Sequence, residues 1–409
     1  MHRVVVTGIG ALTPIGSGVE RFWNATLEGR VGVGPITRFD VDGYASKIAA
    51  QIDDFDASEY MERRRVRWTD RFSQFAVAAA RDALDDAAFS PNGNHHEVGV
   101  WIGSALGGAA FADEQHDVFR RQGLGAVKPL LAIAVFGGAA TSNIALEFDF
   151  RGPSVANANS CAAGAVAIGD AYRAIARGDV RAAVAGGVEA PLSPLAYGAF
   201  TVIGAMSKRN DDPLHASRPF DRERDGFVMA EGAGILVLER LEDARARDAR
   251  IYGEIAGYGL STDAHHMAAP RPDGECSAQA MQVALAEARL ATEEIEAINA
   301  HGSGTPIGDR VEAIALRRVF GESLERIPVV ASKGQHGHAL GASGAWEAVL
   351  SLLMIERKVL PRVTGLIVDD PECALDFVRE TGPRAVRTVL SNTAGFGGLN
   401  AALIFSAVE

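Results

Sequence analysis

Short runs of β-branched residues alternate with longer segments of helical apolar spacing along much of the chain. Residues 3–7 and 98–102 are rich in valine and isoleucine and predict strands, whereas residues 19–27 predict a helix. This alternation is typical of parallel or mixed sheets whose faces are covered by helices. The pattern therefore predicts an α/β fold.

The clearest unit of this kind spans residues 153–188. An extended stretch at 154–156 precedes a helix predicted from about Cys161 to residue 177; Gly178 would end that helix, and a strand follows at 180–185. This order predicts a βαβ unit with Cys161 at the start of its helix.

A second long helix is predicted at residues 339–357, where apolar side chains recur at helical spacing, namely Ala345, Ala348, Val349, Leu352 and Leu353. Like the first helix, it begins among small residues that permit close backbone approach, and it leads to an extended stretch from Val359. Residues 251–257 also resemble the opening residues 4–10. We therefore predict a duplicated α/β module, with an N-terminal half at 1–250 and a C-terminal half at 251–409 that share one packed body.

Composition and charge narrow the class of protein. The 409 residues are 47% hydrophobic, enough for a large core, and the net charge of −12 argues against wholesale binding of nucleic acid or an anionic membrane. The most apolar stretch, residues 130–146, is interrupted by glycine and polar residues and is too short to span a membrane. Three widely spaced cysteines and no visible secretion signal predict a cytoplasmic location.

Cys161 is the first candidate for chemistry. A thiol at a helix start lies near free backbone N–H groups and the positive end of the helix dipole, both of which favour the thiolate. The alternative for any single cysteine is a small, buried core residue. The position of Cys161 does not by itself decide between them.

Two glycine-flanked histidine segments favour the chemical interpretation. His301 and His338 are each predicted in a turn before a helix, with few side chains available to bury them. A cysteine with two such histidines is the arrangement of acyl-transfer enzymes. Metal binding by His336 and His338 is the alternative, but no nearby carboxylate or cysteine completes a set of ligands, so no metal is expected.

Other polar and glycine-rich segments have simpler interpretations. Asp309 with Glu312 is expected to cap the helix that follows His301. Residues 395–398 lack the lysine of a P-loop and are better interpreted as a tight turn that presents an N–H group to a developing oxyanion. The basic run at 62–71 is either a solvated helix face or a local guide for an acidic partner.

Taken together, these motifs resemble the β-ketoacyl-acyl carrier protein synthases, and most closely the type II elongation enzyme. The resemblance covers essentially the whole chain, and besides Cys161 and the two histidine segments it rests on residues 4–10, 186–189, 217–221, 225–227 and 392–400. It implies a duplicated thiolase-type fold with five layers, αβαβα, and usually a homodimer.

The resemblance also implies roles for individual residues. Cys161 would be the nucleophile that accepts the acyl group from a carrier-protein thioester. His301 and His338 would donate hydrogen bonds to the thioester oxygen of malonyl-carrier protein during its decarboxylation. Lys333 and Glu347 match the polar network that supports the second histidine.

Further positions match the substrate path of the family. The backbone N–H groups of Cys161 and Phe396 would form an oxyanion hole, and the Phe396 ring would gate acyl entry. Ser303 and Thr305 would hold the phosphopantetheine arm, and Leu106 matches a residue at the floor of the acyl pocket. No other cofactor is implied, because the substrates are carried on the phosphopantetheine of the acyl carrier protein.

Four basic residues match the docking site for the acyl carrier protein: Arg64, Arg67, Lys208 and Arg209. They would account for local positive charge on an acidic protein. The implied reaction is a decarboxylative Claisen condensation that elongates an acyl chain by two carbons, which makes the protein an acyltransferase of fatty acid synthesis.

Departures from the family pattern leave alternatives open. Ala394 stands where an aromatic residue is common, Leu399 replaces a threonine, Ser160 replaces a small alanine, and 334–336 differ from the usual segment. A ketosynthase of a dedicated polyene or polyketide pathway is therefore an alternative, as is a non-catalytic partner subunit in a heterodimer. A thiolase would need a second catalytic cysteine, and Cys373 lacks the glycine-rich setting for that role.

Overall fold

A computed structural model describes residues 1–408, and its central feature is an eleven-stranded sheet made of two matching halves. The first half contains β1 (Val4–Thr13), β2 (Gly16–Ser17), β5 (Val98–Gly103), β6 (Ser154–Asn157), β7 (Ala182–Glu189) and β8 (Gly232–Arg240). The second contains β9 (Gly253–Thr262), β10 (Ala297–Asn299), β11 (Val329–Val330), β14 (Thr388–Gly395) and β15 (Leu399–Ser406). Two small ribbons complete the strands, β3 (Val33–Pro35) with β4 (Ile48–Ala50) and β12 (Val359–Leu360) with β13 (Gly382–Pro383).

The two halves of the sheet repeat one pairing pattern. The order is β11-β10-β14-β15-β9-β1-β8-β7-β5-β6. In the first half β5 pairs in parallel with β6 and β7, while β8 is antiparallel to β7 and β1; in the second half β10, β11, β14, β15 and β9 repeat this arrangement. Within residues 1–408, strand pairing joins the two halves of the sheet only between β1 and β9, through the register pairs Val5–Glu254 and Val6–Gly253. The predicted duplication is therefore visible as a repeat of topology.

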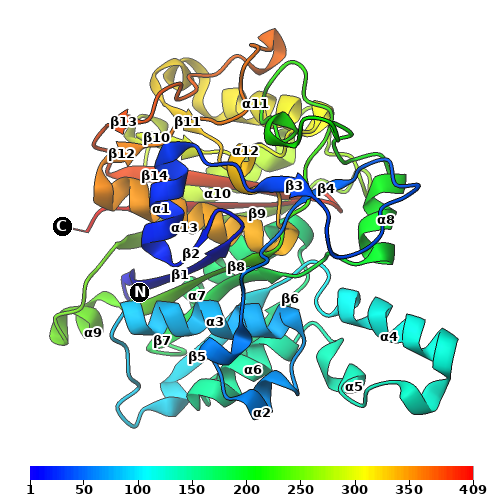
Figure 1. Cartoon of the computed structure of the whole chain (residues 1–409). Coiled ribbons are helices and arrows are strands. Elements are labelled where there is room, and N and C mark those ends of the chain that lie inside the picture. Colours follow the sequence, from blue (N-terminus) through cyan, green and yellow to red (C-terminus); the bar gives the residue numbers. More distant parts are fainter. Residues whose placement is uncertain (409) are drawn as a thin grey trace.

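Thirteen helices cover and separate the two halves of the sheet within residues 1–408. Those of the first half are α1 (Val19–Glu28), α2 (Arg63–Val66), α3 (Arg71–Asp86), α4 (Ala109–Gln122), α5 (Leu131–Ala134), α6 (Ala139–Phe148), α7 (Ala163–Arg177), α8 (Pro194–Val202) and α9 (Leu241–Ala246). The others are α10 (Glu275–Ala288), α11 (Pro306–Phe320), α12 (Lys333–His336) and α13 (Ser343–Arg357). Figure 1 shows five layers, with α3 and α6 on one outer face, α10 and α11 on the other, and α7 and α13 between the two halves of the sheet.

The central helices α7 and α13 approach closely because both begin with small residues. A Cβ atom added to Gly164 would lie 2.7 Å from the carbonyl oxygen of Gly341, and one added to Gly344 would lie 3.0 Å from the Ala165 backbone nitrogen. A short 3-10 turn precedes each helix, Ser160–Ala162 before α7 and Leu340–Ala342 before α13. Both turns begin with a residue of left-handed backbone, Ser160 with a φ of 51° and Leu340 with a φ of 42°.

Several predicted boundaries shift in the structure. Cys161 lies in the turn before α7 rather than in the helix, and the strand predicted at 180–185 runs instead from Ala182 to Glu189. The extended stretch at Val359 forms β12, which pairs with β13 outside the main sheet. The predicted βαβ unit is present as β6, α7 and β7, with β5 lying between its two parallel strands.

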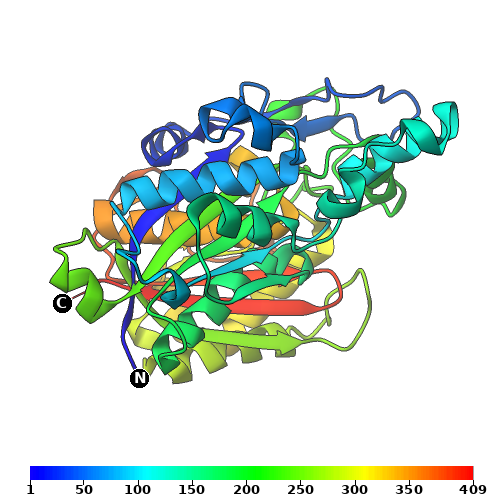
Figure 2. The ribbon, with the colours of Figure 1, turned by 90° about the horizontal axis from the view of Figure 1, so that it is seen from below.

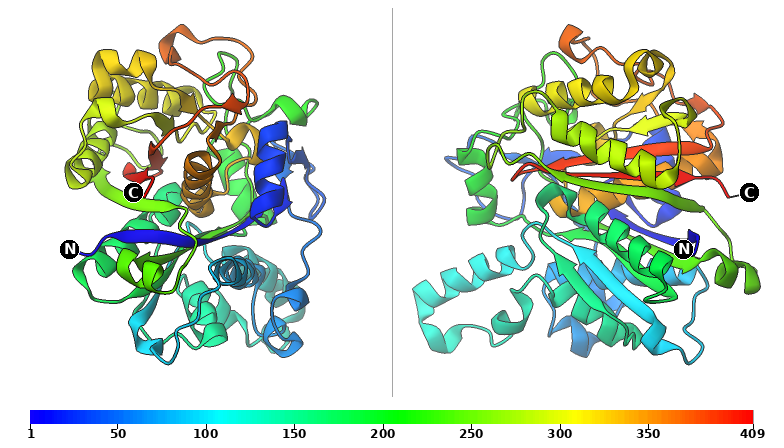
Figure 3. Two further views of the ribbon diagram at one scale, coloured as in Figure 1. Left: turned by 90° about the vertical axis from the view of Figure 1, so that its left-hand side faces the viewer. Right: turned by 180° about the vertical axis from the view of Figure 1, so that it is seen from behind.

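One part of the first half extends away from the layers. The helices α4 and α5 project from the body, as Figures 1 and 2 both show. The views in Figure 3 show the same layered body from its side and from behind. No helix among residues 1–408 is both long enough and apolar enough to cross a membrane.

Candidate active site

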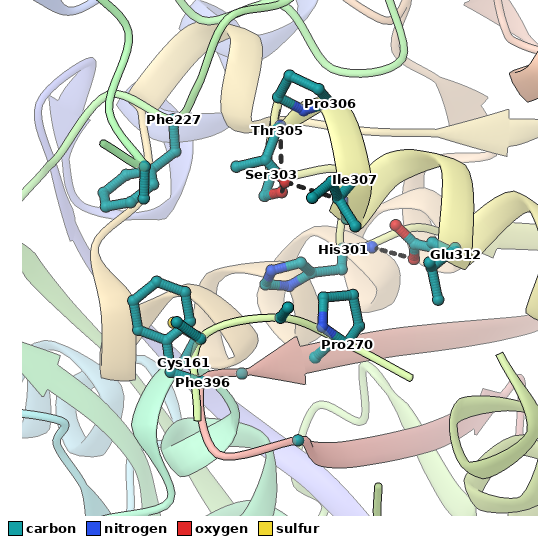
Figure 4. A pocket seen from close by; sticks show the side chains of 18 of the residues that line it. Cys161, Phe227, Pro270, His301, Ser303, Thr305, Pro306, Ile307, Glu312 and Phe396 are labelled. Carbon is teal, nitrogen blue, oxygen red and sulfur yellow. Dashed lines mark hydrogen bonds between the residues drawn. The ribbon is translucent and has the colours of Figure 1, made fainter. Parts of the chain in front are cut away.

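A single cavity brings Cys161 together with His301 and His338. The cavity has a volume of about 370 Å³, and its lining includes all three residues. They come from distant segments: the turn before α7, the loop after β10 and the loop after α12. Figure 4 shows Cys161 and His301 facing the same space, with Phe396 beside the thiol.

The β14–β15 turn packs directly against the nucleophile candidate. A Cβ atom added to Gly395 would lie 3.0 Å from the Cys161 backbone nitrogen, so the approach requires glycine. Gly397 and Gly398 have φ values of 83° and 71°, a backbone region that glycine enters without steric cost. Phe396 lies between Gly395 and Gly397 in this turn, and its ring stacks on that of Phe200 with centroids 6.1 Å apart. The turn therefore places both a backbone N–H group and an aromatic ring beside Cys161.

The surroundings of Cys161 correct one expectation from the sequence. Burial raises the pKa of the thiol above 9.0, although the Ser160 hydroxyl, the Phe396 N–H group and the charge of Lys333 oppose this effect. The thiol is only 7% exposed, and it lies in a 3-10 turn rather than in the first turn of a long helix. Loss of solvation therefore outweighs the expected stabilisation of the thiolate by the helix start.

His301 and His338 are perpendicular neighbours. Their ring centroids are 5.3 Å apart with an interplanar angle of 87°. The side chain of Glu312 accepts hydrogen bonds from the backbone N–H groups of His301 at 2.7 Å and Gly302 at 2.8 Å, which fixes the loop. The Nδ1 atom of His338 is 2.8 Å from the Ser343 hydroxyl. The backbone at His301 and the ring of His338 are thus each held by a hydrogen-bond partner.

Both histidines are buried, contrary to the expectation that few side chains would cover them. His301 is 8% exposed and His338 is 3% exposed. Burial is the largest cause that lowers the pKa of each imidazole well below 6.5, and the neighbouring Lys333 charge lowers both further. Both rings are therefore neutral at physiological pH.

The Lys333–Glu347 pair contacts the first histidine rather than the second, which corrects the role implied by the family pattern. The Lys333 ammonium pairs with Glu347 and donates to the carbonyl oxygen of His301, and it lies 3.4 Å from Nδ1 of that ring. Both charged side chains are almost fully buried. Lys333 therefore orients His301.

The sequence predicted that Asp309 and Glu312 cap α11, but in the structure they do not. The side chain of Thr305 accepts from the Gly308 N–H group at 3.1 Å and takes the cap position instead. Asp309 accepts from the Ser303 hydroxyl at 3.1 Å and from the Gly304 N–H group at 3.0 Å. The carboxylates of Asp309 and Glu312 instead accept hydrogen bonds from the loop that contains His301.

Ser303, Thr305 and Phe396 line the same cavity, whereas Leu106 does not line it. The hydroxyls of Ser303 and Thr305 are 2.9 Å apart, and a dashed line in Figure 4 marks the hydrogen bond between them. Leu106 packs against the apolar cluster that contains Cys161. The structure thus places polar groups and an apolar wall around one thiol.

Glu189 is a site residue to which the sequence analysis assigned no role. Its fully buried carboxylate accepts from the backbone N–H groups of Ala105 at 2.7 Å, Leu106 at 3.1 Å and Gly341 at 2.9 Å, and from the Ser104 hydroxyl at 2.9 Å. Burial raises the pKa of Glu189 to about 7. Its only sequence signal is the Gly-Gly-Val-Glu segment at the end of β7.

The four basic residues predicted to dock a partner fall into two groups. Lys208 and Arg209 lie near the cavity, since the Lys208 N–H group donates to Asp225, a cavity-lining residue, at 2.9 Å. Arg64 in α2 and Arg67 at its end are exposed, and they do not line the cavity. In Figure 1, α2 lies at the opposite end of the molecule from α11.

His336 and Cys373 are separated from this chemistry. The His336 ring is buried in the core, where its Nε2 atom is 2.9 Å from the Ser332 hydroxyl and its ring meets Trp346 edge to face. Cys373 lies in a different apolar cluster and does not line the cavity, which removes the candidate for a thiolase-type second cysteine. Within the described chain, no group of three or more His, Cys, Asp or Glu side chains could hold a metal ion.

Comparison with known families and proteins gives matches across the chain. The family description "Beta-ketoacyl synthase, N-terminal domain" matches residues 1–244, and "Beta-ketoacyl synthase, C-terminal domain" matches residues 252–366. A relative from Synechocystis named "3-oxoacyl-[acyl-carrier-protein] synthase 2" is 43% identical over 405 residues, covering 98% of this chain and 97% of the relative. A Staphylococcus aureus protein of the same name is 41% identical and covers 100% of this chain and 99% of its own length.

Solved structures give a similar result. The ishigamide ketosynthase/chain length factor superposes with a TM-score of 0.94 at 35% identity, and a β-ketoacyl synthase from Burkholderia phymatum superposes with a TM-score of 0.92 at 36% identity. The complex of a type II polyketide synthase acyl-carrier protein with its ketosynthase, AntDE:AntF, gives a TM-score of 0.91 at 33% identity. In each case the match covers 100% of both chains.

Proposed function

The chain belongs to the β-ketoacyl synthase family, and on that basis we propose that it condenses an acyl group with malonyl-acyl carrier protein to give a 3-oxoacyl-acyl carrier protein in fatty acid elongation. The observation that carries the proposal is the meeting of Cys161, His301 and His338 in one cavity. The enzyme is thus an acyltransferase whose nucleophile and decarboxylation groups share a site.

The first step loads the acyl group onto Cys161. Cys161 gives up its proton, and its thiolate attacks the thioester of an acyl-carrier protein. A bond forms between Sγ and the carbonyl carbon, the bond from that carbon to the pantetheine sulfur breaks, and the pantetheine thiolate takes up the proton that Cys161 released. The backbone N–H groups of Cys161 and Phe396 hold the oxyanion that develops on the carbonyl oxygen. Ser303 and Thr305, which line the cavity, hold the pantetheine arm through their hydroxyls.

The second step is decarboxylation of malonyl-carrier protein. An ammonium group only donates hydrogen bonds, so Lys333 places the proton of the neutral His301 ring on Nε2. A Ser343 hydroxyl that donates to Nδ1 does the same for His338. Two N–H donors then stabilise the enolate oxygen, each worth roughly 2.7–4 kcal/mol by comparison with other oxyanion sites.

The third step forms the carbon–carbon bond. The enolate carbon attacks the acyl carbonyl on Cys161, and the bond to Sγ breaks with its electron pair returning to sulfur. No step in this route needs a metal ion or a redox cofactor. The only prosthetic group we propose is the phosphopantetheine of the carrier protein.

Decarboxylation is expected to be insensitive to mild acidification. Because the pKa of each active-site histidine lies well below 6.5, both rings stay neutral and keep their donor function between pH 8 and pH 6. The rate of CO₂ release from malonyl-carrier protein by a Cys161→Ala variant should therefore change less than about threefold over this range. A steep fall below pH 7 would show that an imidazole becomes protonated there.

We further propose that the carrier protein docks through the basic residues Arg64, Arg67, Lys208 and Arg209. Exposure of Arg64 and Arg67 on a chain of net charge −12 supports a local site for an acidic partner. The solved ketosynthase–carrier complex among the structural relatives supports the same class of partner.

Charge reversal tests this dock. Arg64→Glu with Arg67→Glu is expected to lower kcat/KM for acyl-carrier protein at least tenfold, and to leave kcat/KM for a short acyl-pantetheine thioester nearly unchanged. Arg384→Glu, at an exposed arginine near β13, is the matched control. Equal losses with both substrates would rule out a docking role for Arg64 and Arg67.

The proposed assembly is a homodimer formed through the β6 edge of the sheet. β6 pairs only with β5 within residues 1–408, and Val155 on it is 40% exposed. Leu146 is an exposed apolar side chain on α6, which packs beside β6, and three more lie on the projecting segment, namely Phe119, Ile133 and Phe136. An unpaired strand edge beside apolar side chains favours a second copy of the chain.

A charged residue in this edge is expected to prevent dimerisation. Val155→Glu should convert the dimer to a monomer in sedimentation velocity experiments, because it would place a carboxylate in an apolar contact. Leu260→Glu, at a residue that is 38% exposed on β9, is the control and should stay dimeric. A dimer that persists in the Val155 variant would place the interface elsewhere.

A ketosynthase of a dedicated polyketide pathway is the second candidate function, with the ishigamide ketosynthase/chain length factor as its supporting structural relative. In that case the partner across β6 would be a different subunit. A cytoplasmic location stays a prediction from the sequence.

Mass spectrometry of the intact protein tests the function directly. The enzyme is mixed with a panel of saturated and polyene acyl-carrier proteins and then with malonyl-carrier protein. We expect an acyl mass on Cys161 that disappears as a 3-oxoacyl product forms, and the donors that load report which pathway is served. Absence of loading from every donor would favour the non-catalytic partner subunit.

A further inference from the structure

Cys161 has few charged neighbours that favour its thiolate. The charged groups that act on it are Lys333 on α12, which favours the thiolate, and Glu189 on β7, which opposes it. Lys333 is paired with Glu347, and His301 and His338 are neutral, so neither histidine supplies a positive charge. Other ionisable groups that line the cavity are Asp225, Asp263, Arg271 and Glu312.

The side chain of Ser160 lies directly beside the nucleophile. Its Oγ atom is 3.8 Å from Sγ of Cys161, within the range of a hydrogen bond to sulfur. Among residues 1–408, no other hydrogen-bond partner competes for this hydroxyl.

The backbone holds Ser160 in a defined position. Its φ of 51° is left-handed, which is uncommon for a residue with a side chain, and its N–H group donates to the carbonyl oxygen of Ala158 at 2.8 Å. The β14–β15 turn also packs tightly against Ser160, because a Cβ atom added to Gly395 would lie 3.3 Å from Cβ of Ser160. A strained residue fixed from two sides at a reactive thiol is consistent with a chemical role.

We propose that the Ser160 hydroxyl is a hydrogen-bond donor to the Cys161 sulfur that stabilises its thiolate. This inference rests on the proposed function, in which sulfur carries negative charge twice. It does so when the thiolate attacks the acyl-carrier thioester, and again when the C–Sγ bond breaks and the electron pair returns to sulfur. In both steps the hydroxyl proton stays on Ser160, so the donor acts without proton transfer.

Alkylation of Cys161 tests the proposal without any carrier protein. The rate of labelling by iodoacetamide is measured from pH 6.5 to pH 10, with peptide mapping to separate Cys161 from Cys276 and Cys373. Ser160→Ala is expected to shift the midpoint of the pH profile upward and to slow labelling at pH 7.5 about 3- to 10-fold, as for loss of a hydrogen bond to a charged group. Ser160→Gly also lacks the hydroxyl, and its backbone accepts a positive φ, so it should show the same shift.

The control is Ser73→Ala, which removes a buried hydroxyl in α3 that makes no hydrogen bond within the described residues. Its labelling profile should match that of the unmodified protein. Identical profiles for both Ser160 variants and this control would overturn the proposal.

A second measurement separates this role from a general loss of activity. Decarboxylation of malonyl-carrier protein depends on His301 and His338, so Ser160→Ala should lower acyl loading and leave CO₂ release unchanged. A parallel fall in both rates would show that Ser160 only supports the shape of the site. If no acyl group loads in the unmodified enzyme, the proposed function fails, while the alkylation result still decides the role of the hydroxyl.

Discussion

Replacement of Cys161 with alanine is expected to abolish condensation and to leave the fold intact. In the proposed reaction the thiol carries the acyl group in both bond-forming steps, and removal of a covalent nucleophile lowers kcat by roughly 10⁴-fold or more in other enzymes with such a nucleophile. The side chain is small and lies in a tight turn of small residues, so alanine fits its space. Condensation is followed by the mass of the 3-oxoacyl product, and the fold by thermal unfolding.

The same variant separates the two halves of the reaction. His301 and His338 remain in place, so Cys161→Ala should still release CO₂ from malonyl-carrier protein. Cys276→Ala, which removes a thiol at the start of α10, is the matched control and should retain condensation. Condensation by the Cys161 variant at the rate of the unmodified enzyme would exclude Cys161 as the nucleophile.

Glu347→Leu is expected to cause the largest loss of stability. Lys333 is 1% exposed and its ammonium pairs with Glu347, so removal of the carboxylate leaves a buried charge without its counter-ion. Breaking a buried pair in this way costs about 3–5 kcal/mol of the free energy of unfolding. Denaturant unfolding monitored by circular dichroism gives this difference.

The double variant Lys333→Met with Glu347→Leu tests the cause of that loss. Replacing both partners by apolar side chains removes the unpaired charge and should restore most of the stability. Decarboxylation should stay impaired, because His301 loses the donor at Nδ1 and the contact to its carbonyl oxygen. A double variant as unstable as Glu347→Leu would mean that the pair stabilises the fold through something other than charge compensation.

The meeting of Cys161, His301 and His338 in one cavity could be predicted from the sequence, because each residue lies in a short segment with its own pattern. The histidine that Lys333 contacts could not be predicted, although Lys333 and Glu347 were placed in one network. The resemblance to the family placed Lys333 and Glu347 in the polar network that supports His338. In the structure β10 and β11 are parallel with Asn299 opposite Val330, so the residues that follow the two strands, His301 and Lys333, lie side by side. The contact depends on strand register, which the local pattern does not contain.

Two further expectations from the sequence were wrong, namely that Asp309 and Glu312 cap α11 and that the helix start favours the Cys161 thiolate. Thr305 followed by Pro306 already provides a cap, which leaves Asp309 free to bind the loop that holds Ser303. Burial raises the pKa of Cys161, and segments distant in the sequence contribute to that burial, among them the β14–β15 turn, where Gly395 packs against the Cys161 backbone. The α/β class and the duplication were predictable from the sequence, because the alternation of strands and helices and the repeat of the opening strand are both local features. The five layers were implied by the resemblance to the family.

The duplication of the fold bears on how many acyl groups each chain can carry. In the turn before α13, Gly341 holds the place that Cys161 holds before α7, and Leu340 repeats the left-handed backbone of Ser160. A side chain at 341 would begin 2.6 Å from the Ala105 backbone nitrogen and 2.8 Å from the Glu189 carboxylate, so the second half has no room for a nucleophile. Each chain should therefore accept one acyl equivalent at saturation, although it contains two copies of the same α/β module.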